Sequence, residues 1–299
     1  MELNHETVTT PPVDAASVLL LRDAPQGLQV LLLRRAQASQ VLGGAYVFPG
    51  GKLDAEDQAS DVLPLLSESP ARLRERLGEA ALEDHRAAGL FMAALREAFE
   101  ECGVLVGQAQ AGAALAAQLR QPSGQPSGQP SGQPGWHQSL RSAGQRLRTE
   151  DLLPWSRWIT PRQPSVTNKR FDTRFFIARV GDDQVARHDD FETTDSVWLT
   201  PQQALQRYAD GEIALIAPQI MSLYQLKAHP TVDAALDEAR ERPPALIEPH
   251  PFDENGQRIL CYPGDARHPV ATRAMRGPTR LLFNGGRFMP LEGMAVLLD

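Results

Sequence analysis

Three glutamates within a short stretch constrain this chain more than any other feature of its sequence. Residues 93–104 read AALREAFEECGV, and Glu97, Glu100 and Glu101 fall within one narrow arc of a helix that turns about 100° per residue. The other side of that helix is apolar, with Phe91, Leu95, Ala98, Phe99 and Cys102. The pattern predicts a helix that buries one face and presents three carboxylates on the other.

The three carboxylates repel one another, because glutamates three or four positions apart on a helix are like-charge neighbours. Each such pair costs roughly a few tenths of a kcal/mol unless something neutralises it. A run of charges usually just faces water, so a solvated helix face is the simplest interpretation of an isolated E-x-x-E-E. The alternative is a divalent cation, since grouped carboxylates suit Mg²⁺ or Mn²⁺.

The residues around the glutamates favour the cation. Arg96 precedes the first carboxylate, Gly103 stands where a left-handed helix C-cap is wanted, and residues 48–51 form a Phe-Pro-Gly-Gly turn upstream. Together these residues resemble the Nudix box, G-x5-E-x7-R-E-U-x-E-E-x-G-U, with Gly51 as its first glycine. Asp57 stands where the family has Glu, and the 38 residues from 58 to 95 replace the usual seven. The box is therefore split, and only a fold that returns Gly51 to Arg96 makes it one site.

The resemblance implies an α/β fold, an α/β/α sandwich around a mixed sheet, and hydrolysis of a nucleoside diphosphate linked to another moiety. The Gly51 carbonyl with Glu97, Glu100 and Glu101 would hold Mg²⁺ or Mn²⁺, and Arg96 would orient the carboxylates. The same three glutamates and Arg96 are the expected catalytic residues. The general base is either a box glutamate or a later acid, for which the sequence offers Asp189, Asp190, Glu192 and Asp195.

Two further segments point to a substrate class. W-x-x-W-x-T-P at 155–161 and R-F-D-T-x-F-F at 170–176 look like the acyl-coenzyme A diphosphatase branch of the Nudix superfamily. Residues 31–51 also resemble the coenzyme A signature of Nudix proteins, L-L-T-x-R-(S/A)-x3-R-x3-G-x3-F-P-G-G. Leu33 replaces its Thr and Gln40 replaces its second Arg.

Coenzyme A carries a 3′-phosphate near its adenine, so a selective site needs a cation there. The arginines that suit this role are Arg35, Arg170 and Arg174. For Arg35, an equally good interpretation is that it ends a strand and reaches solvent. The aromatic residues of segments 155–161 and 170–176 either line a nucleotide-binding wall or pack in the core.

Composition bounds the setting of the protein. The 299 residues are 42% hydrophobic and carry a net charge of −7, which argues against a general nucleic-acid binder. The small nucleotide-diphosphate substrate that the resemblance implies must therefore be bound by a local site. Two cysteines, Cys102 and Cys261, imply no disulfide framework, and a reducing cytoplasm is the expected location. No apolar run approaches a membrane span, and the start of the chain lacks the pattern of a signal peptide. The sequence is compatible with a homodimer.

The domain organisation follows from shifts in composition. We expect a disordered arm at 1–13, a Nudix hydrolase domain at 14–228, and a C-terminal helix and β-rich extension at 229–299. Within the domain, 58–83 is predicted to be a helical insert, and 121–135, which contains Gln-Pro-Ser-Gly three times, a flexible excursion. The expected strands are 16–22, 28–35, 45–48, 155–161, 170–178, 196–199, 245–247, 258–261, 280–283 and 286–288. The expected helices are 85–102 with Asp84 as its cap, 109–120, 136–148, 202–209, 217–226 and 231–242.

Two classes of function fit these observations. The first is an active Mg²⁺-dependent or Mn²⁺-dependent diphosphatase, for coenzyme A and acyl-coenzyme A or for general dinucleotides such as NADH and ADP-ribose. The second is a binding module with a Nudix fold and lost chemistry. The sequence favours the enzyme, because a module that needs only shape has no reason to keep three repelling glutamates together.

Overall fold

An eight-stranded mixed sheet forms the centre of the computed structural model, which describes residues 3–4, 6–37, 42–107, 136–143, 146–166, 168–181, 184–186 and 193–299. Its strands lie in the order β3-β2-β1-β6-β5-β8, while β4 pairs with β1 and β7 pairs with β2. The bounds are β1 Val13–Ala24, β2 Gly27–Arg35, β3 Tyr46–Val47, β4 Gly50–Lys52, β5 Leu153–Ile159, β6 Phe171–Arg179, β7 Thr193–Leu199 and β8 Ala245–Ile247.

The pairing at the centre of the sheet explains why its strands are so apolar. β1 and β6 are parallel, with Val13 opposite Phe171, and β5 and β8 are also parallel, whereas the other described pairs are antiparallel. Along β1, Leu19 contributes to one hydrophobic core and Leu20 to the other. A strand buried on both faces needs apolar residues at every position, which accounts for the unbroken run in the sequence.

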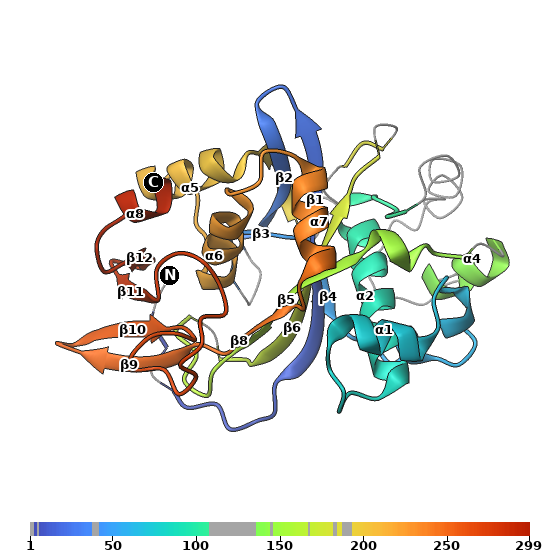
Figure 1. Ribbon diagram of the computed structural model, residues 1–299, viewed down its shortest axis with the longest axis horizontal. Coiled ribbons are helices and arrows are strands. Elements are labelled where there is room, and N and C mark those ends of the chain that lie inside the picture. Colours follow the sequence, from blue (N-terminus) through green and yellow to red (C-terminus); the bar gives the residue numbers. More distant parts are fainter. Residues whose placement is uncertain are drawn as a thin grey trace.

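Helices cover both faces of the sheet (Figure 1). One core contains side chains of α1, α2 and α4, and the other contains side chains of α5, α6 and α7. The helix bounds are α1 Pro70–Leu77, α2 Asp84–Cys102, α4 Trp136–Ala143, α5 Pro201–Asp210, α6 Ala217–Leu226, α7 Val232–Glu241 and α8 Ala295–Leu298. The predicted α/β/α sandwich around a mixed sheet is confirmed.

The helix that carries the three glutamates, α2, is one residue longer than predicted. It begins at Asp84 with Glu83 in the N-cap position, so the predicted cap by Asp84 was wrong. The Asp84 carboxylate instead accepts a 2.5 Å hydrogen bond from Arg74 Nε. The helix ends at Cys102, and Gly103 has a φ of 70°, the left-handed conformation that glycine adopts without a steric penalty.

The insert that splits the Nudix-like box folds against α2. It contains 3-10 turns at Glu56–Gln58 and Leu63–Leu65 and the helix α1, whose first turn is capped by the Ser69 side chain with Pro70 at the first helical position. Leu73 and Leu77 of α1 join the α2 core. The insert therefore adds a packed layer beside the long helix, rather than an isolated excursion.

The last quarter of the chain is bound to the sheet more closely than an appendage would be. β9 His250–Glu254, β10 Gln257–Cys261, β11 Arg280–Asn284 and β12 Arg287–Pro290 form a separate antiparallel sheet in the order β12-β11-β10-β9. In contrast, β8 adds to the main sheet, and Tyr262 and Phe288 share a hydrophobic core with α5 and α6. Residues on both sides of position 228 thus belong to one core.

Some expected features fall elsewhere or outside the described residues. The predicted helix 136–148 is shorter, because α4 ends at Ala143. The predicted helix 109–120 and the repeat at 121–135 lie outside the described residues.

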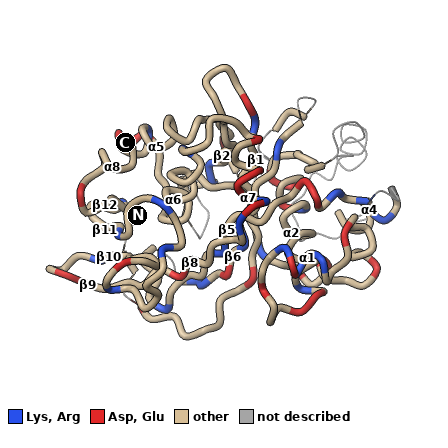
Figure 2. The backbone as a smooth tube through the Cα atoms, in the orientation of Figure 1, with Lys and Arg blue, Asp and Glu red and all other residues tan. Residues whose placement is uncertain are grey.

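No helix in the part of the chain that the structure describes is long and apolar enough to cross a membrane. Figure 2 shows Lys and Arg residues interspersed with Asp and Glu residues along the described tube.

Candidate active site

The two halves of the split box meet where β4 runs alongside β1 and faces α2. β4 is held against β1 by pairing of Gly51 with Ala16. The backbone N–H of Gly50 donates a 2.9 Å hydrogen bond to Glu101 Oε2. A Cβ atom on Gly51 would lie 2.1 Å from Glu97 Oε1, so any side chain there would displace the glutamate. Glycine at this position lets the backbone and the Glu97 carboxylate come into direct contact.

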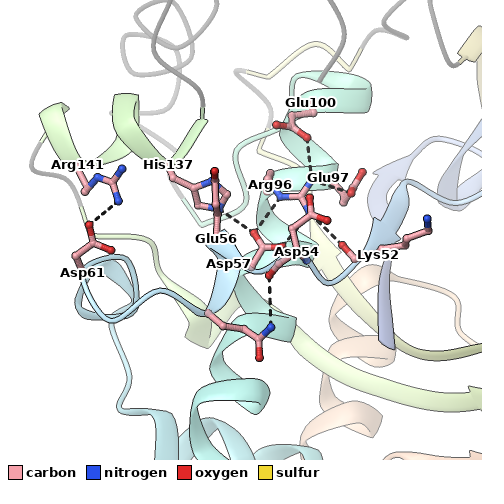
Figure 3. Close-up of polar contacts among 11 residues, drawn as sticks. Lys52, Asp54, Glu56, Asp57, Asp61, Arg96, Glu97, Glu100, His137 and Arg141 are labelled. Carbon is pink, nitrogen blue, oxygen red and sulfur yellow. Dashed lines mark hydrogen bonds and ion pairs between the residues drawn. The ribbon is translucent and has the colours of Figure 1, made fainter. Parts of the chain in front are cut away.

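Arg96 lies at the centre of the charged groups at the site and contacts several of them (Figure 3). It is 5% exposed, and its Nη1 donates to Glu97 Oε1 at 2.8 Å and to Glu100 Oε2 at 3.0 Å. Its Nη2 donates to the Lys52 carbonyl at 3.1 Å, which fixes the helix to the strand β4. Burial lowers the pKa of Arg96, but its carboxylate partners raise it further, so the net shift is upward and the guanidinium stays charged.

Asp57, the residue that stands in place of the family's Glu, completes the arrangement. It is fully buried, and it binds Arg96 with both oxygens, to Nε at 3.0 Å and to Nη2 at 2.9 Å. A bidentate pair of this kind fixes both position and orientation of the guanidinium. Burial raises the pKa of the Asp57 carboxyl, but hydrogen bonds from His137 and Arg96 outweigh it and lower the pKa overall.

His137 was not predicted as a site residue. It lies on α4, is buried, and places Nε2 at 2.9 Å from Asp57 Oδ1 and Nδ1 at 3.1 Å from Glu56 Oε2. Its neighbour Trp136 stacks on Phe99 of α2 with ring centroids 5.0 Å apart. In the sequence, His137 showed no ligand spacing and followed a low-complexity segment, so only the fold reveals its role.

Comparison with known proteins places this geometry in a family. Residues 73–226, just over half of the chain, match the family model described as the NUDT19 Nudix domain. The chain belongs to the Nudix family. The predicted resemblance to this branch is confirmed, and the match begins inside the insert, downstream of Gly51 and Asp57.

Similar proteins agree with this assignment. The chain is 29% identical to human acyl-coenzyme A diphosphatase NUDT19 over 231 residues, which are 67% of this chain and 61% of the relative. It is 29% identical to the protein of the same name from Xenopus laevis over 226 residues, 66% of this chain and 59% of the relative. The chain thus spans about three fifths of the length of these two relatives. The crystal structure of a Nudix hydrolase from Alicyclobacillus acidocaldarius is 26% identical, with a TM-score of 0.56 over 77% of this chain and 97% of that one.

The Nudix box of this chain carries a surplus of negative charge. Asp57, Glu97 and Glu100 share the single guanidinium of Arg96, Asp54 lies 3.5 Å from its Nη2, and Glu101 adds a fifth carboxylate. Burial and the neighbouring Asp57 raise the pKa of Glu100, and Arg96 only partly opposes them. The Glu100 side chain is 39% exposed, more than those of Asp57 and Glu97.

The donor set suits a hard divalent cation by its chemistry, since it consists of carboxylate oxygens beside a glycine backbone. No three His, Cys, Asp or Glu side chains are arranged as a finished metal site among the described residues. Arg96 currently lies between Glu97 and Glu100. The residues therefore fit a metal through charge and donor type, with the fourth partner expected from the Gly51 carbonyl.

The three arginines proposed for the 3′-phosphate lie in different surroundings. Arg174 is 3% exposed and binds Glu79, at 2.9 and 2.7 Å, and Asp14, at 2.5 Å. Asp14 also contacts Arg86 in the first turn of α2, at the helix end opposite the box glutamates. The structure does not bring Arg174 to the box, and its ion pairs do not favour a substrate role.

Arg170 and Arg35 differ in their freedom to bind a phosphate. Arg170 is buried and donates to the carbonyls of Thr160, at 2.9 Å, and Thr10, at 3.3 Å. Arg35 ends β2, and its backbone pairs with Ala45, five residues before Gly50. The buried Nε of Arg35 has no hydrogen-bond partner among the described residues. Of the three, Arg35 is the one with a buried donor atom that no described residue pairs.

Of the four later acids proposed as general base, the structure places one. Asp195 lies on β7 and accepts a 2.9 Å hydrogen bond from the Tyr46 hydroxyl through Oδ2. Asp189, Asp190 and Glu192 lie outside the described residues.

Proposed function

We propose that this protein is a divalent-metal-dependent Nudix diphosphatase that hydrolyses coenzyme A or acyl-coenzyme A to adenosine 3′,5′-bisphosphate and (acyl-)phosphopantetheine. The contact of Gly50 and Gly51 with Glu101 and Glu97 carries the proposal, because it joins the two halves of the box across 38 intervening residues. The names of the human and Xenopus relatives support the substrate class.

In this proposal Glu97, Glu100, Glu101 and the Gly51 carbonyl would hold Mg²⁺ or Mn²⁺. Such a cation would offset the charge of the diphosphate and lower the pKa of a water molecule that attacks it. Arg96 holds Glu97 and Glu100 in place, and the Gly50 N–H holds Glu101. A box glutamate or one of the later acids Asp189, Asp190, Glu192 and Asp195 would accept the proton of the attacking water.

Arg35 is the proposed partner of the 3′-phosphate, since its Nε is buried without a hydrogen-bond partner among the described residues. The proposed setting is the cytoplasm, because Cys102 and Cys261 form no disulfide in the described part of the chain. The proposed partner is a small nucleotide-diphosphate rather than a nucleic acid, and the protein acts as a monomer or a homodimer.

The metal site is tested by replacing Glu101 with Gln, which removes one charge while keeping side-chain size. We expect kcat/KM at saturating Mg²⁺ to fall at least about a hundredfold, while thermal stability measured in chelator holds, because like-charge repulsion is relieved. Glu83→Gln, at the far end of α2, is the control and should be neutral. Turnover of Glu101→Gln within threefold of wild type at low Mg²⁺ would refute the assignment of this helix face.

The substrate class is tested by comparing coenzyme A, octanoyl-coenzyme A, 3′-dephospho-coenzyme A, NADH and ADP-ribose at equal Mg²⁺, with products identified by mass. A charge-assisted hydrogen bond contributes roughly 1.5 to 3 kcal/mol. Loss of the 3′-phosphate should therefore lower kcat/KM by about one to two decades. A tenfold preference for NADH or ADP-ribose would leave a general dinucleotide diphosphatase, and hydrolysis of none of the five would favour a binding module.

A further inference from the structure

A cavity of about 510 Å³ lies on the face of the main sheet opposite α2. Its walls come from β5, α6, α7, β8 and the loop at 273–277. This volume falls within the usual range of pockets that hold small organic molecules. The lining residues Trp155 and Ile247 belong to one hydrophobic core and the inner face of α2 to the other, so the cavity is separate from the Nudix box.

The tryptophans of the W-x-x-W-x-T-P motif form part of the apolar wall. Trp155 and Trp158 both line the cavity, because a bulge between Pro154 and Ser156 shifts the register of β5. Met221 of α6 and Ile247 of β8 continue this wall. Aromatic and aliphatic side chains of this kind suit the apolar body of a ligand.

Three buried polar atoms on residues that line the cavity have no hydrogen-bond partner among the described residues. They are Ser156 Oγ, Ser222 Oγ and Trp158 Nε1, and each of these residues is at most 5% exposed. Buried polar groups are normally paired, because an unpaired one is costly. All three can donate, and the indole N–H can only donate. Because each of these atoms has almost no surface that water can reach, they are buried donors behind the wall of the cavity and not groups that a ligand in it contacts directly.

The charges around the cavity favour an anion. Arg242, Arg273 and Arg276 line it together with one carboxylate, Glu238. Glu238 accepts from Arg242 Nε and from Arg276 Nη2, both at 2.9 Å. Three guanidinium groups against one carboxylate leave a net positive charge, and Arg273 and Arg276 are exposed, so this charge is presented toward solvent.

The loop that forms one wall is fixed in place. Gly277 has a φ of 94°, and a Cβ there would lie 2.5 Å from a Tyr224 ring carbon, so this position requires glycine. The side chain of Gln225 binds the backbone of Arg276 on both sides, accepting from its N–H at 3.0 Å and donating to its carbonyl at 2.7 Å. The cavity is therefore built before any ligand arrives.

We propose that this cavity is a binding site for a small amphipathic organic anion. The apolar body lies against the wall formed by Trp155, Trp158 and Ile247. A carboxylate or phosphate group pairs with Arg273 and Arg276, whose planar forks match either anion. The proposal is independent of the diphosphatase function, because it rests on none of the box residues.

The test is calorimetric titration of the full chain with three probes that share one octanoyl amide. N-octanoylglycine carries a carboxylate, N-octanoyl-O-phosphoethanolamine carries a phosphate, and N-octanoylethanolamine is neutral. We expect at least one anionic probe to bind at least about tenfold more tightly than the neutral one. The tighter of the two anions identifies which source of negative charge the site prefers.

Two variants locate the binding. Arg276→Gln should weaken the anion about tenfold or more, and Ala274→Phe should abolish binding by filling the mouth. The matched controls are Ala271→Phe in the same loop and Arg240→Gln on α7, neither of which lines the cavity, and both should bind as wild type. If Ala274→Phe does not fold, Arg276→Gln decides. Equal affinity for the neutral probe, unchanged binding by Arg276→Gln, or no binding of either anion would overturn the proposal.

Discussion

Asp57 connects three parts of the chain at the box although its side chain is fully buried. Its carboxylate receives two hydrogen bonds from Arg96 on α2, one from the backbone of Asp54 at 2.9 Å, and a contact with His137 on α4. An aspartate is one methylene shorter than the glutamate of the family pattern, and the 3-10 turn at Glu56–Gln58 carries it to Arg96. The substitution therefore preserves the pairing with the guanidinium.

His137 should act as a positioning residue for this pairing. His137→Ala removes one partner of Asp57 and loosens Arg96, so we expect kcat to fall about tenfold, equivalent to roughly 1.4 kcal/mol, with KM nearly unchanged. His137→Gln, which can donate to the same oxygen, should recover most of the loss. The measurement is steady-state kinetics of both variants, with His85→Ala at an exposed position as control. A variant that melts earlier but retains wild-type kcat would show that His137 only stabilises the fold.

At the scale of elements, a buried ionic cluster links β1, β6 and the insert. Arg174 of β6 binds Asp14 of β1 and Glu79, which follows α1, and Arg157 of β5 also contacts Glu79 at 2.8 Å. The cluster lies at the first turn of α2, where Arg86 contacts Asp14. It holds the insert to the sheet from the end opposite the glutamates.

Arg174→Met should destabilise the protein without changing its selectivity. Removing one partner of a buried ion pair leaves the other charge uncompensated, which costs about 3 to 5 kcal/mol. We expect that loss in urea unfolding, with an unchanged ratio of kcat/KM for coenzyme A over its 3′-dephospho form. Arg179→Met, at a more exposed position of the same strand, should cost less than about 1 kcal/mol. A selective loss of activity toward coenzyme A in Arg174→Met would instead return this arginine to the substrate site.

Elements were predictable from the sequence where their pattern lies within a few neighbouring residues. The arc of Glu97, Glu100 and Glu101 and the turn at Gly103 depend on neighbours within one helix, so periodicity and capping identify them. The role of His137 depends on Asp57, 80 positions earlier, and no spacing pattern connects them. Likewise β8 is three residues long, and its sequence carries no information about pairing with β5. Contacts between residues far apart in the sequence, such as His137 with Asp57 and β8 with β5, could be identified only from the fold.

At the scale of the whole molecule, the C-terminal sheet and the Nudix domain stabilise each other. The Tyr208 hydroxyl of α5 donates a 2.5 Å hydrogen bond to the Phe288 carbonyl of β12, and burial raises the pKa of Tyr208 to about 12. Within the extension, Asp265 binds Arg280 through both oxygens at 2.7 and 2.9 Å. This ion pair fastens the loop before β11 to the first residue of that strand.

Acid should weaken this contact. Hydrogen bonds from Arg280, Thr279 and the Arg267 backbone lower the pKa of Asp265 to about 2, although partial burial opposes the shift. The folded pKa lies below the ordinary value of 3.8, so its stabilisation is complete above pH 4 and is lost as the pH falls toward 2. Asp265→Asn should lower the free energy of unfolding by about 2 kcal/mol at pH 6, and the difference from wild type should shrink toward zero near pH 2.

Urea unfolding between pH 2 and pH 6 measures this difference. Asp237→Asn, whose exposed carboxylate pairs with Arg240, is the control and should show a difference below about 1 kcal/mol at every pH. A difference between wild type and Asp265→Asn that stays constant down to pH 2 would contradict the assignment.

The parallel pairing of β1 with β6 has a consequence for synthesis on the ribosome. Val13 cannot meet Phe171 until the intervening residues have been translated, which takes roughly 10 to 30 s at typical elongation rates. During that interval the apolar hairpin of β1 and β2 leaves the exit tunnel without the strand that covers its edge. We expect nascent chains stalled before residue 171 to bind a holding chaperone, and chains released after residue 228 to bind it far less.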